Sequence, residues 1–377
     1  MVMKKIFICI LVLCTASAMF TFISMADAKV VNSREDISTV EEAPYNENPL
    51  TGVADLSDEA IGKRPVAVMV NNHPDNYPQW NIRQADVIFE VVVEHTLTRF
   101  MCLYSDYTNL PYIVSPRSYR YYFGALAAGF DAFYIHFGED STMLWYLDEL
   151  GLDTYDGITN SYLFGWDSSR LNAGYAQEHS SYFNGALFPS QIEADGLRTD
   201  LDEDHLDTAF KFVNYGTVVR PDGNPCMYVD IQFGEQTAQF VYDEENDVYL
   251  KEALNEAQID GITGEQLSFT NVFVLYTKIY DREDEPEADR KWLDWEGGDD
   301  AVGYYISNGA IQKIHWSKES EQDRLRFYDT DGNELSINRG KTYIALTYDK
   351  SATYSKTYPE KYLTADVDQD SDSVTFD

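Results

Sequence analysis

The first half of the chain alternates apolar runs of strand type with runs that have helical spacing. Apolar positions three and four residues apart predict helices over 118–128 and 141–150, each followed by a glycine. Polar His95 and Thr96 lie between two strand-like runs and predict a hairpin. Strands and helices therefore interleave over 48–210, which predicts a mixed α/β domain. The runs that predict strands are 65–70, 87–93, 99–104 and 132–137.

From residue 217 onward the apolar runs become shorter and lose helical spacing. Turn sequences such as Asn308-Gly309 separate them, and Asn-Gly is typical of turns between antiparallel strands. We therefore expect a smaller, mostly antiparallel β domain over 217–348, which makes the fold class α+β. The acidic stretch 349–377 is expected to be an unstructured tail. The predicted strands are 227–233, 238–242, 248–250, 272–276, 301–306, 311–316, 325–328 and 342–346.

The N-terminus has the three parts of a secretory signal. Two lysines precede an apolar run over 6–25, and small residues follow up to Ala28. We expect residues 1–28 to be a signal peptide cleaved after Ala28, followed by a polar linker over 29–47. The protein is then extracytoplasmic, either secreted or associated with the cell envelope.

Two alternatives for the N-terminus remain open. The apolar run is about 20 residues long, enough to span a bilayer if it is never cut. Cys14 is a candidate for lipidation, although the preceding Leu13 is bulky where lipoprotein signals have a small residue. We expect contact with a membrane only through this segment, if it is uncleaved or lipidated.

The charge of the chain argues against some partners, and missing motifs argue against common cofactors and metals. Its formal net charge is −36, which repels nucleic acid and anionic membrane surfaces. The 28 Tyr, 20 Phe and 6 Trp residues nevertheless predict a folded protein rather than a disordered one. No phosphate-binding glycine loop, H-E-x-x-H motif or cysteine ligand cluster occurs, so we expect no cofactor and no metal. Cys102 lies in an apolar run, where a buried thiol is the usual outcome.

Several blocks of sequence taken together resemble the YerB-like family of bacterial envelope lipoproteins. The resemblance covers residues 48 to about 346 and implies an α/β part, a β-rich part and an envelope location, but no established activity. One departure is that His95 and Thr96 stand where the family usually has glycines. The blocks are Arg64 to Pro74, Ala85 to Glu90, Glu94, Thr98 to Phe100, Pro116 to Arg120, Tyr134 to His136, Thr263 to Glu265, Asn271-Val272 and Phe327 to Asp329.

Arg117 and Arg120 are the first candidates for ligand binding. They lie next to the predicted start of a helix, where free N–H groups and guanidinium donors attract a phosphate, a carboxylate or an anionic glycan. The alternative is structural: both arginines pair with Asp86, Glu90 or Glu94 and hold the domain together.

Further candidates lie in other blocks and in the irregular segment 157–188. Arg170 and His179 belong to that segment, where His179 precedes Ser180; nucleophilic catalysis is one reading and the ordering of a loop is the other. The remaining candidates belong to predicted strands: Glu94, Arg99 and His136, of which Glu94 and His136 are possible proton-transfer groups and His136 alternatively a packed core residue.

These observations lead to one expected function and to alternatives from other classes. We expect an exported, non-catalytic protein that binds an envelope ligand or a protein partner. The first alternative is a hydrolase or transferase that acts on phosphate-containing envelope polymers, with the arginines clamping phosphate. The second is a structural scaffold whose acidic surface keeps neighbours apart.

Overall fold

The computed structural model describes residues 29–31, 43–284, 288–362 and 373–375. The predicted signal peptide and most of the predicted linker lie outside these residues. Strand β1 (Lys29–Val31) pairs in parallel with β10 (Thr217–Val219), so the start of the predicted linker is a strand. Among the described residues, no helix has the length and apolar character needed to cross a membrane.

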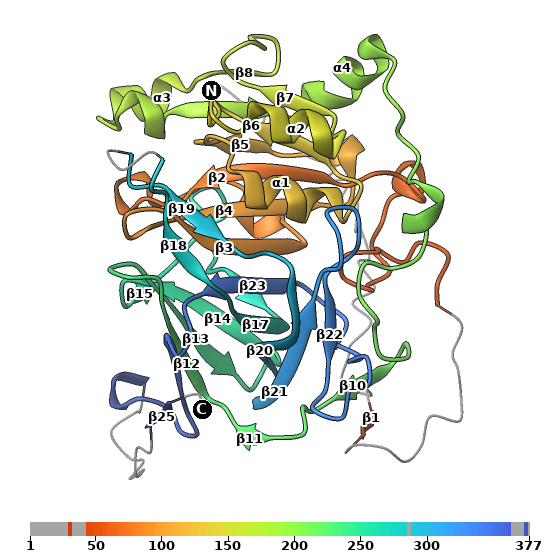
Figure 1. The fold of residues 1–377 in the computed structure, drawn as a ribbon, viewed down its shortest axis with the longest axis vertical. Helices are drawn as coiled ribbons and strands as arrows, with labels where there is room; N and C mark the ends of the chain where they lie inside the picture. Colours follow the sequence, from red (N-terminus) through yellow and green to blue (C-terminus); the bar gives the residue numbers. More distant parts are fainter. Residues whose placement is uncertain (1–28, 32–42, 285–287, 363–372, 376–377) are drawn as a thin grey trace, which may run out of the picture.

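A mixed sheet of eleven strands runs through the molecule and takes strands from both halves of the chain (Figure 1). Its order is β11-β21-β20-β17-β23-β3-β4-β2-β6-β7, with β22 paired to β21. Strand β23 pairs in parallel with β17 on one side and with β3 on the other. The two predicted domains are therefore joined by one continuous sheet. Its strands are β11 (Asn224–Pro225), β21 (Ala310–Ser317), β20 (Gly297–Ser307), β17 (Asn271–Tyr276), β23 (Thr342–Thr347), β3 (Val87–Glu94), β4 (Leu97–Tyr104), β2 (Val66–Asn71), β6 (Phe133–His136), β7 (Thr154–Asp156) and β22 (Arg326–Tyr328).

Both faces of this sheet are buried, which explains the continuous apolar runs of its strands. In β2, Val66 and Val68 contribute to one core while Ala67 and Met69 contribute to the other. The first core lies against two smaller sheets, and the second is covered by α1 and α2. The larger of the two contains β12 (Tyr228–Gln232), β13 (Thr237–Asp243), β14 (Val248–Ala253), β15 (Glu256–Ala257), β16 (Ser268–Phe269), β24 (Ala352–Ser355) and β25 (Ser373–Thr375). The smaller one contains β5 (Tyr112–Val114), β8 (Phe164–Trp166) and β9 (Ser181–Asn184).

Four α-helices and one further pair of strands complete the fold. The helix α2 ends at Gly151, whose φ of 64° is the left-handed conformation that glycine adopts readily. The hairpin predicted around His95 is formed by β3 and β4, and the turn at Asn308-Gly309 has positive φ at both residues. The elements are α1 (Tyr121–Ala128), α2 (Leu144–Leu150), α3 (Ser168–Asn172), α4 (Phe188–Asp195), β18 (Ile279–Asp281) and β19 (Lys291–Leu293).

Three details differ from the sequence-based expectation. Helix α1 begins at Tyr121, not at Ser118, because Arg120 has extended backbone angles at the N-cap. Strand β24 lies inside the predicted unstructured tail, where Ala352 and Tyr354 are buried in the first core. The segment 157–188 is ordered by short elements, β8, α3 and β9, which are too short to show a period in the sequence.

A buried ion pair joins the two halves of the chain at the first core. The side chains of Glu90 and Lys251 are 1% and 0% exposed, and Lys251 Nζ lies 3.4 Å from Glu90 Oε2. The hydroxyl of Tyr343 donates to Glu90 Oε2 at 2.6 Å, and Thr98 donates to Oε1 at 2.8 Å. Burial lowers the pKa of Lys251, and the charge of Glu90 opposes that shift. The pair is stable only because further hydrogen bonds surround both charges.

The network continues from the ion pair into the loop that follows β2. Asn72 donates to Glu90 Oε1 at 2.9 Å, and its own Oδ1 accepts from Tyr77, Gln79 and Gln258. Gln258 Oε1 in turn accepts from Lys251 Nζ at 2.7 Å. The N-terminal loop and the C-terminal β region are therefore held by one connected set of hydrogen bonds.

Lys251→Met is expected to lower the free energy of unfolding by about 3–5 kcal/mol, because it leaves Glu90 buried without a cation. Lys63→Met, which removes an exposed ion pair with Asp200 (2.5 Å), should change it by about 0.5 kcal/mol or less. Urea unfolding measures both. The double variant Glu90→Gln/Lys251→Met should recover part of the loss, and equal effects of the two lysine variants would contradict the role of the buried pair.

A chain that ends at residue 339 is expected not to fold, because it lacks β23 and leaves β3 and β17 without their shared neighbour. A chain that ends at 362 should fold like the full protein, since among the described elements it loses only the edge strand β25. Far-UV circular dichroism and cooperative urea unfolding distinguish the two chains. A cooperative transition in the shorter chain would show that the two halves fold independently.

Candidate functional site

Three loops meet beyond the C-terminal end of β2. The backbone N–H of Asn71 donates to Ser115 O at 3.0 Å, and the N–H of Ser115 donates to Ser181 O at 2.6 Å. The N–H of Asp167, the residue after β8, donates to Ser180 O at 2.6 Å, so the end of β8 also lies at this junction. Strands β2 and β6 are parallel neighbours, so this position lies at the carboxyl edge of parallel strands, where open sheets usually bind ligands.

Arg170 ties two of these loops together. Its guanidinium donates to carbonyl oxygens of Pro78 (3.1 Å), Asn76 (2.9 Å) and His179 (2.9 Å). The side chain is 2% exposed and lies over the ring of Tyr175, 3.8 Å from its centroid. Arg170 therefore acts as a structural tie between loops and does not offer its donors to a ligand.

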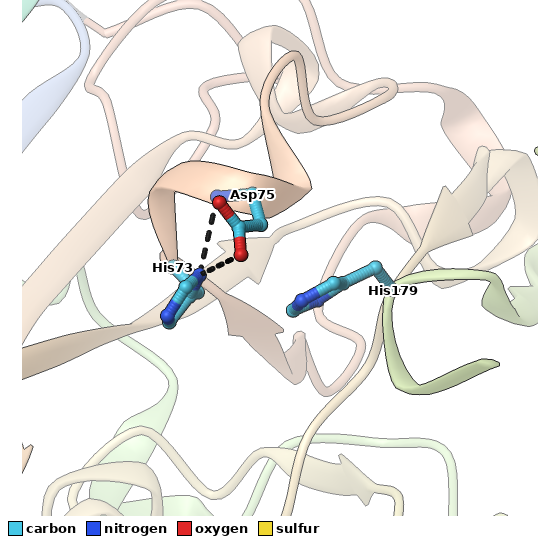
Figure 2. A group of neighbouring side chains, drawn as sticks. All are labelled: His73, Asp75 and His179. Atoms are coloured by element: carbon cyan, nitrogen blue, oxygen red, sulfur yellow. Dashed lines mark hydrogen bonds and ion pairs between the residues drawn. The ribbon is translucent and has the colours of Figure 1, made fainter. Parts of the chain in front are cut away.

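His179 lies beside two residues that the sequence did not single out, His73 and Asp75 (Figure 2). The imidazoles of His73 and His179 are stacked, with centroids 5.4 Å apart. His73 Nδ1 accepts from the backbone N–H of Asp75 at 3.1 Å and lies 3.7 Å from Asp75 Oδ2. Asn71 Nδ2 lies 2.8 Å from His179 Nδ1 and orients that ring. The spacing of His73 and Asp75 is a weak signal by itself, and His179 is distant in sequence.

Arg117 lies next to this group and has a different environment from the other arginines. Within the part of the chain that the structure describes, its guanidinium has no hydrogen bond or ion pair, and its Nε is buried without a partner. Burial and the charge of Arg99 lower the pKa of Arg117 to about 10, and Glu178 partly opposes this. Burial also lowers the pKa of His179, and Arg117 adds to that shift. The two side chains are therefore in electrostatic contact.

Arg120 follows the structural alternative stated for it and Arg117, and Arg99 shares its acid partner. Arg99 Nη2 lies 3.2 Å from Glu94 Oε2, and Arg120 Nη2 pairs with Glu94 Oε1. Arg99 also donates to the carbonyl of Ser118 at 2.6 Å, and Arg120 to that of Tyr119 at 2.5 Å. Glu94 is thus held between two guanidinium groups and joins the hairpin to the start of α1.

His136 is a core residue rather than an accessible base. It is 1% exposed, and its Nδ1 lies 2.9 Å from the carbonyl oxygen of Gly138 and 3.9 Å from Asp156 Oδ1. Burial lowers the pKa of His136 and keeps the imidazole neutral, with Gly138 and Asp156 acting in the opposite direction. A neutral, enclosed ring is suited to packing against Tyr119 and Tyr134, whose centroids lie 6.1 and 5.6 Å away.

The predicted site residues therefore separate into three groups. Arg117 and His179 lie together at the loop junction, while Arg170 supports that junction from behind. Glu94 forms a second cluster with Arg99 and Arg120, and His136 belongs to the core. Two surface hollows elsewhere are lined by other residues, one by Phe210 and Arg326 among others and one by Lys278 and Trp295.

Comparison with known proteins places the chain in a family. Residues 50–198 match the N-terminal domain described as "Protein of unknown function (DUF3048)", and residues 229–344 match its C-terminal domain. The chain is 25% identical over 311 residues to a protein of Bacillus subtilis (strain 168) named "Putative lipoprotein YerB", which covers 81% of this chain and 87% of that protein. The chain belongs to the YerB-like family. The resemblance seen in the sequence is thereby confirmed, and no activity comes with it.

The fold of the YerB-like family is also known from a solved structure. The crystal structure of YerB from Bacillus subtilis matches with a TM-score of 0.69 at 24% identity, over 81% of this chain and 97% of that one. The likeness supports the arrangement of strands and helices described above. It carries no information on a ligand.

Two variants of this YerB-like chain should shift its stability in opposite directions. Arg170→Met should lower the free energy of unfolding by about 3 kcal/mol or more, because several buried carbonyls lose a charged donor. Arg117→Met should raise it by on the order of 1 kcal/mol, because it removes a desolvated charge that has no acid partner. Urea unfolding at neutral pH measures both. A loss of stability in Arg117→Met would mean that this guanidinium is paired in solution.

Proposed function

We propose that this protein is an exported, non-catalytic binding protein that recognises an acidic saccharide or polyol-phosphate polymer of the cell envelope at Arg117. The observation that carries the proposal is the side chain of Arg117, half-buried and without an acid partner among the described residues of a chain with net charge −36. In such an acidic protein, an unpaired arginine beside a loop junction is costly to the fold. A ligand that is itself anionic would offset that cost.

The chemistry of the guanidinium defines the class of ligand. Its planar donors match a carboxylate or a phosphate in bidentate fashion, and such charge-assisted bonds strengthen where water is partly excluded. Desolvation has already lowered the pKa of Arg117. Arg117 stays charged at neutral pH; an anion placed against it would raise that pKa again and gain affinity from the same burial.

An aromatic surface near Arg117 supports a polymer ligand rather than a free ion. The N–H of Phe137 donates to the carbonyl of Arg117 at 3.0 Å, and the rings of Phe137 and Trp166 are 5.8 Å apart. Trp166 is 48% exposed and Ile158 is 67% exposed. Exposed aromatic groups on a segment whose backbone is bonded to that of Arg117 suit the faces of sugar rings that carry an acidic substituent.

The hydrolase or transferase alternative receives less support from the geometry. Glu94 is engaged by Arg99 and Arg120, and His136 is enclosed in the core. Neither group is therefore free to act as an acid or base on a substrate bound at Arg117. Arg120 and Arg170 are likewise engaged, so a three-arginine clamp on phosphate is not assembled.

Export rests on the signal-like N-terminus together with the family relation. The relative in Bacillus subtilis bears the name "Putative lipoprotein YerB", and this name supports an envelope location for this chain as well. An envelope location would place the loop junction among polymers rich in carboxylate and phosphate groups.

Isothermal titration of the full chain with muropeptides, a polyol-phosphate oligomer and a neutral chito-oligosaccharide tests the proposal. The wild-type protein should bind one of the acidic ligands, and Arg117→Met should weaken binding by roughly 10-fold or more, which corresponds to losing one charged hydrogen-bond pair. Added salt should also weaken binding.

The matched control is Arg198→Met. Arg198 is exposed and already paired with Asp131 at 2.7 Å, so its removal takes one positive charge away without touching the junction. Affinity should stay unchanged in this variant. Equal loss in both variants, or preference for the neutral saccharide, would contradict the proposal.

A further inference from the structure

The group His73, Asp75 and His179 has the composition of a metal site. Each residue offers one ligand atom, and these atoms lie within 4.8 Å of one another. The group combines two imidazoles with one carboxylate, contributed by the loop after β2 and by the segment before β9. We propose that the three side chains bind a divalent transition-metal ion of the zinc class. This inference does not depend on the proposed polymer ligand.

The donor set selects the class of ion. Imidazole nitrogen with carboxylate oxygen suits Zn²⁺ and its first-row neighbours, whereas Ca²⁺ and Mg²⁺ prefer sites built from oxygen alone. Three protein ligands leave at least one coordination position open, as in zinc sites that accept water or an exogenous ligand. In an acidic surface, many carboxylates attract cations weakly, but the pair of histidines distinguishes this site from them.

The geometry requires only a small contraction. Ligand atoms that share one ion at about 2.1 Å lie roughly 3.4 Å apart in a tetrahedral site. The side chain of Asp75 is 77% exposed and that of His73 is 34% exposed, so both can rotate toward the ion with little loss of packing. His179 is buried and fixed, since Arg170 holds its carbonyl and Asn71 contacts its ring.

Asn71 contacts both histidines of the group. Asn71 accepts the backbone N–H of His73 through Oδ1 (3.0 Å) and contacts His179 Nδ1 through Nδ2 (2.8 Å). One buried amide thus positions both histidines. Because Oδ1 accepts from His73, Nδ2 donates to His179 Nδ1, and this bond has to open, or the ring has to turn over, for His179 to bind an ion as a neutral imidazole. His73 Nδ1 accepts a hydrogen bond from the backbone N–H of Asp75, so this bond has to open if Nδ1 is to bind the ion.

The test uses the full chain with Zn²⁺ and Co²⁺ as probes. Titration calorimetry should show that one equivalent of Zn²⁺ binds. The ion should also raise the melting temperature, as mass action requires for an ion that binds the folded state. Co²⁺ should give visible absorption bands of a nitrogen- and oxygen-ligated ion, and excess Mg²⁺ should not remove them. Asp75→Asn and His73→Gln should each weaken binding by at least about tenfold, since even outer-shell changes cost roughly 10–100-fold.

The matched control is His95→Gln. His95 and Asp289 form another exposed His–Asp pair, with Nδ1 3.4 Å from Oδ2, but they do not belong to the three-residue group. This variant should bind Zn²⁺ like the wild type. Because Asp75 and His73 lie on the surface, folding of their variants is checked by their urea transition. Unchanged affinity in Asp75→Asn, or the absence of a one-to-one site in the wild type, would overturn the proposal.

Discussion

The ion pair between Glu90 and Lys251 is the constraint on which the rest of the structure depends. Two opposite charges lie without solvent between the central sheet and the smaller β sheet, and both are tolerated because hydroxyl and amide groups complete their hydrogen bonding. Asn72 extends the same network into the loop after β2. The position of that loop, and of every residue that it carries, is therefore set from the core outward.

The arginines show how one residue type serves different purposes in an acidic protein. Arg170 is surrounded by carbonyl oxygens and fixes two loops, and Arg99 shares Glu94 with Arg120 and fixes a hairpin to a helix. Arg117 alone among these four lacks a partner in the described part of the chain. The contrast indicates that carbonyl oxygens and one shared carboxylate satisfy the structural arginines, while the Arg117 guanidinium has no such partner among the described residues.

Local pattern was enough to predict most strands, two of the four α-helices and the hairpin at His95, because apolar spacing reports directly on burial. The continuous sheet was not predictable, since parallel pairing of β23 with β3 depends on contacts between residues about 250 positions apart. The site was found only in part. Arg117 and His179 were named from sequence, but neither the neutralisation of Arg120 by Glu94 nor the approach of His73 to His179 leaves a local signal.

The place of β23 in the sheet also determines the order of events during synthesis. An interior strand near the end of the chain means that the neighbours β3 and β17 wait, with unpaired edges, until nearly all of the polypeptide has been made. Strands β2, β3 and β4 pair with one another within the first third of the chain, but the sheet stays open at the position of β23. The strand edges exposed in the meantime can pair with other chains, so the stage before β23 is added is the one most prone to aggregation.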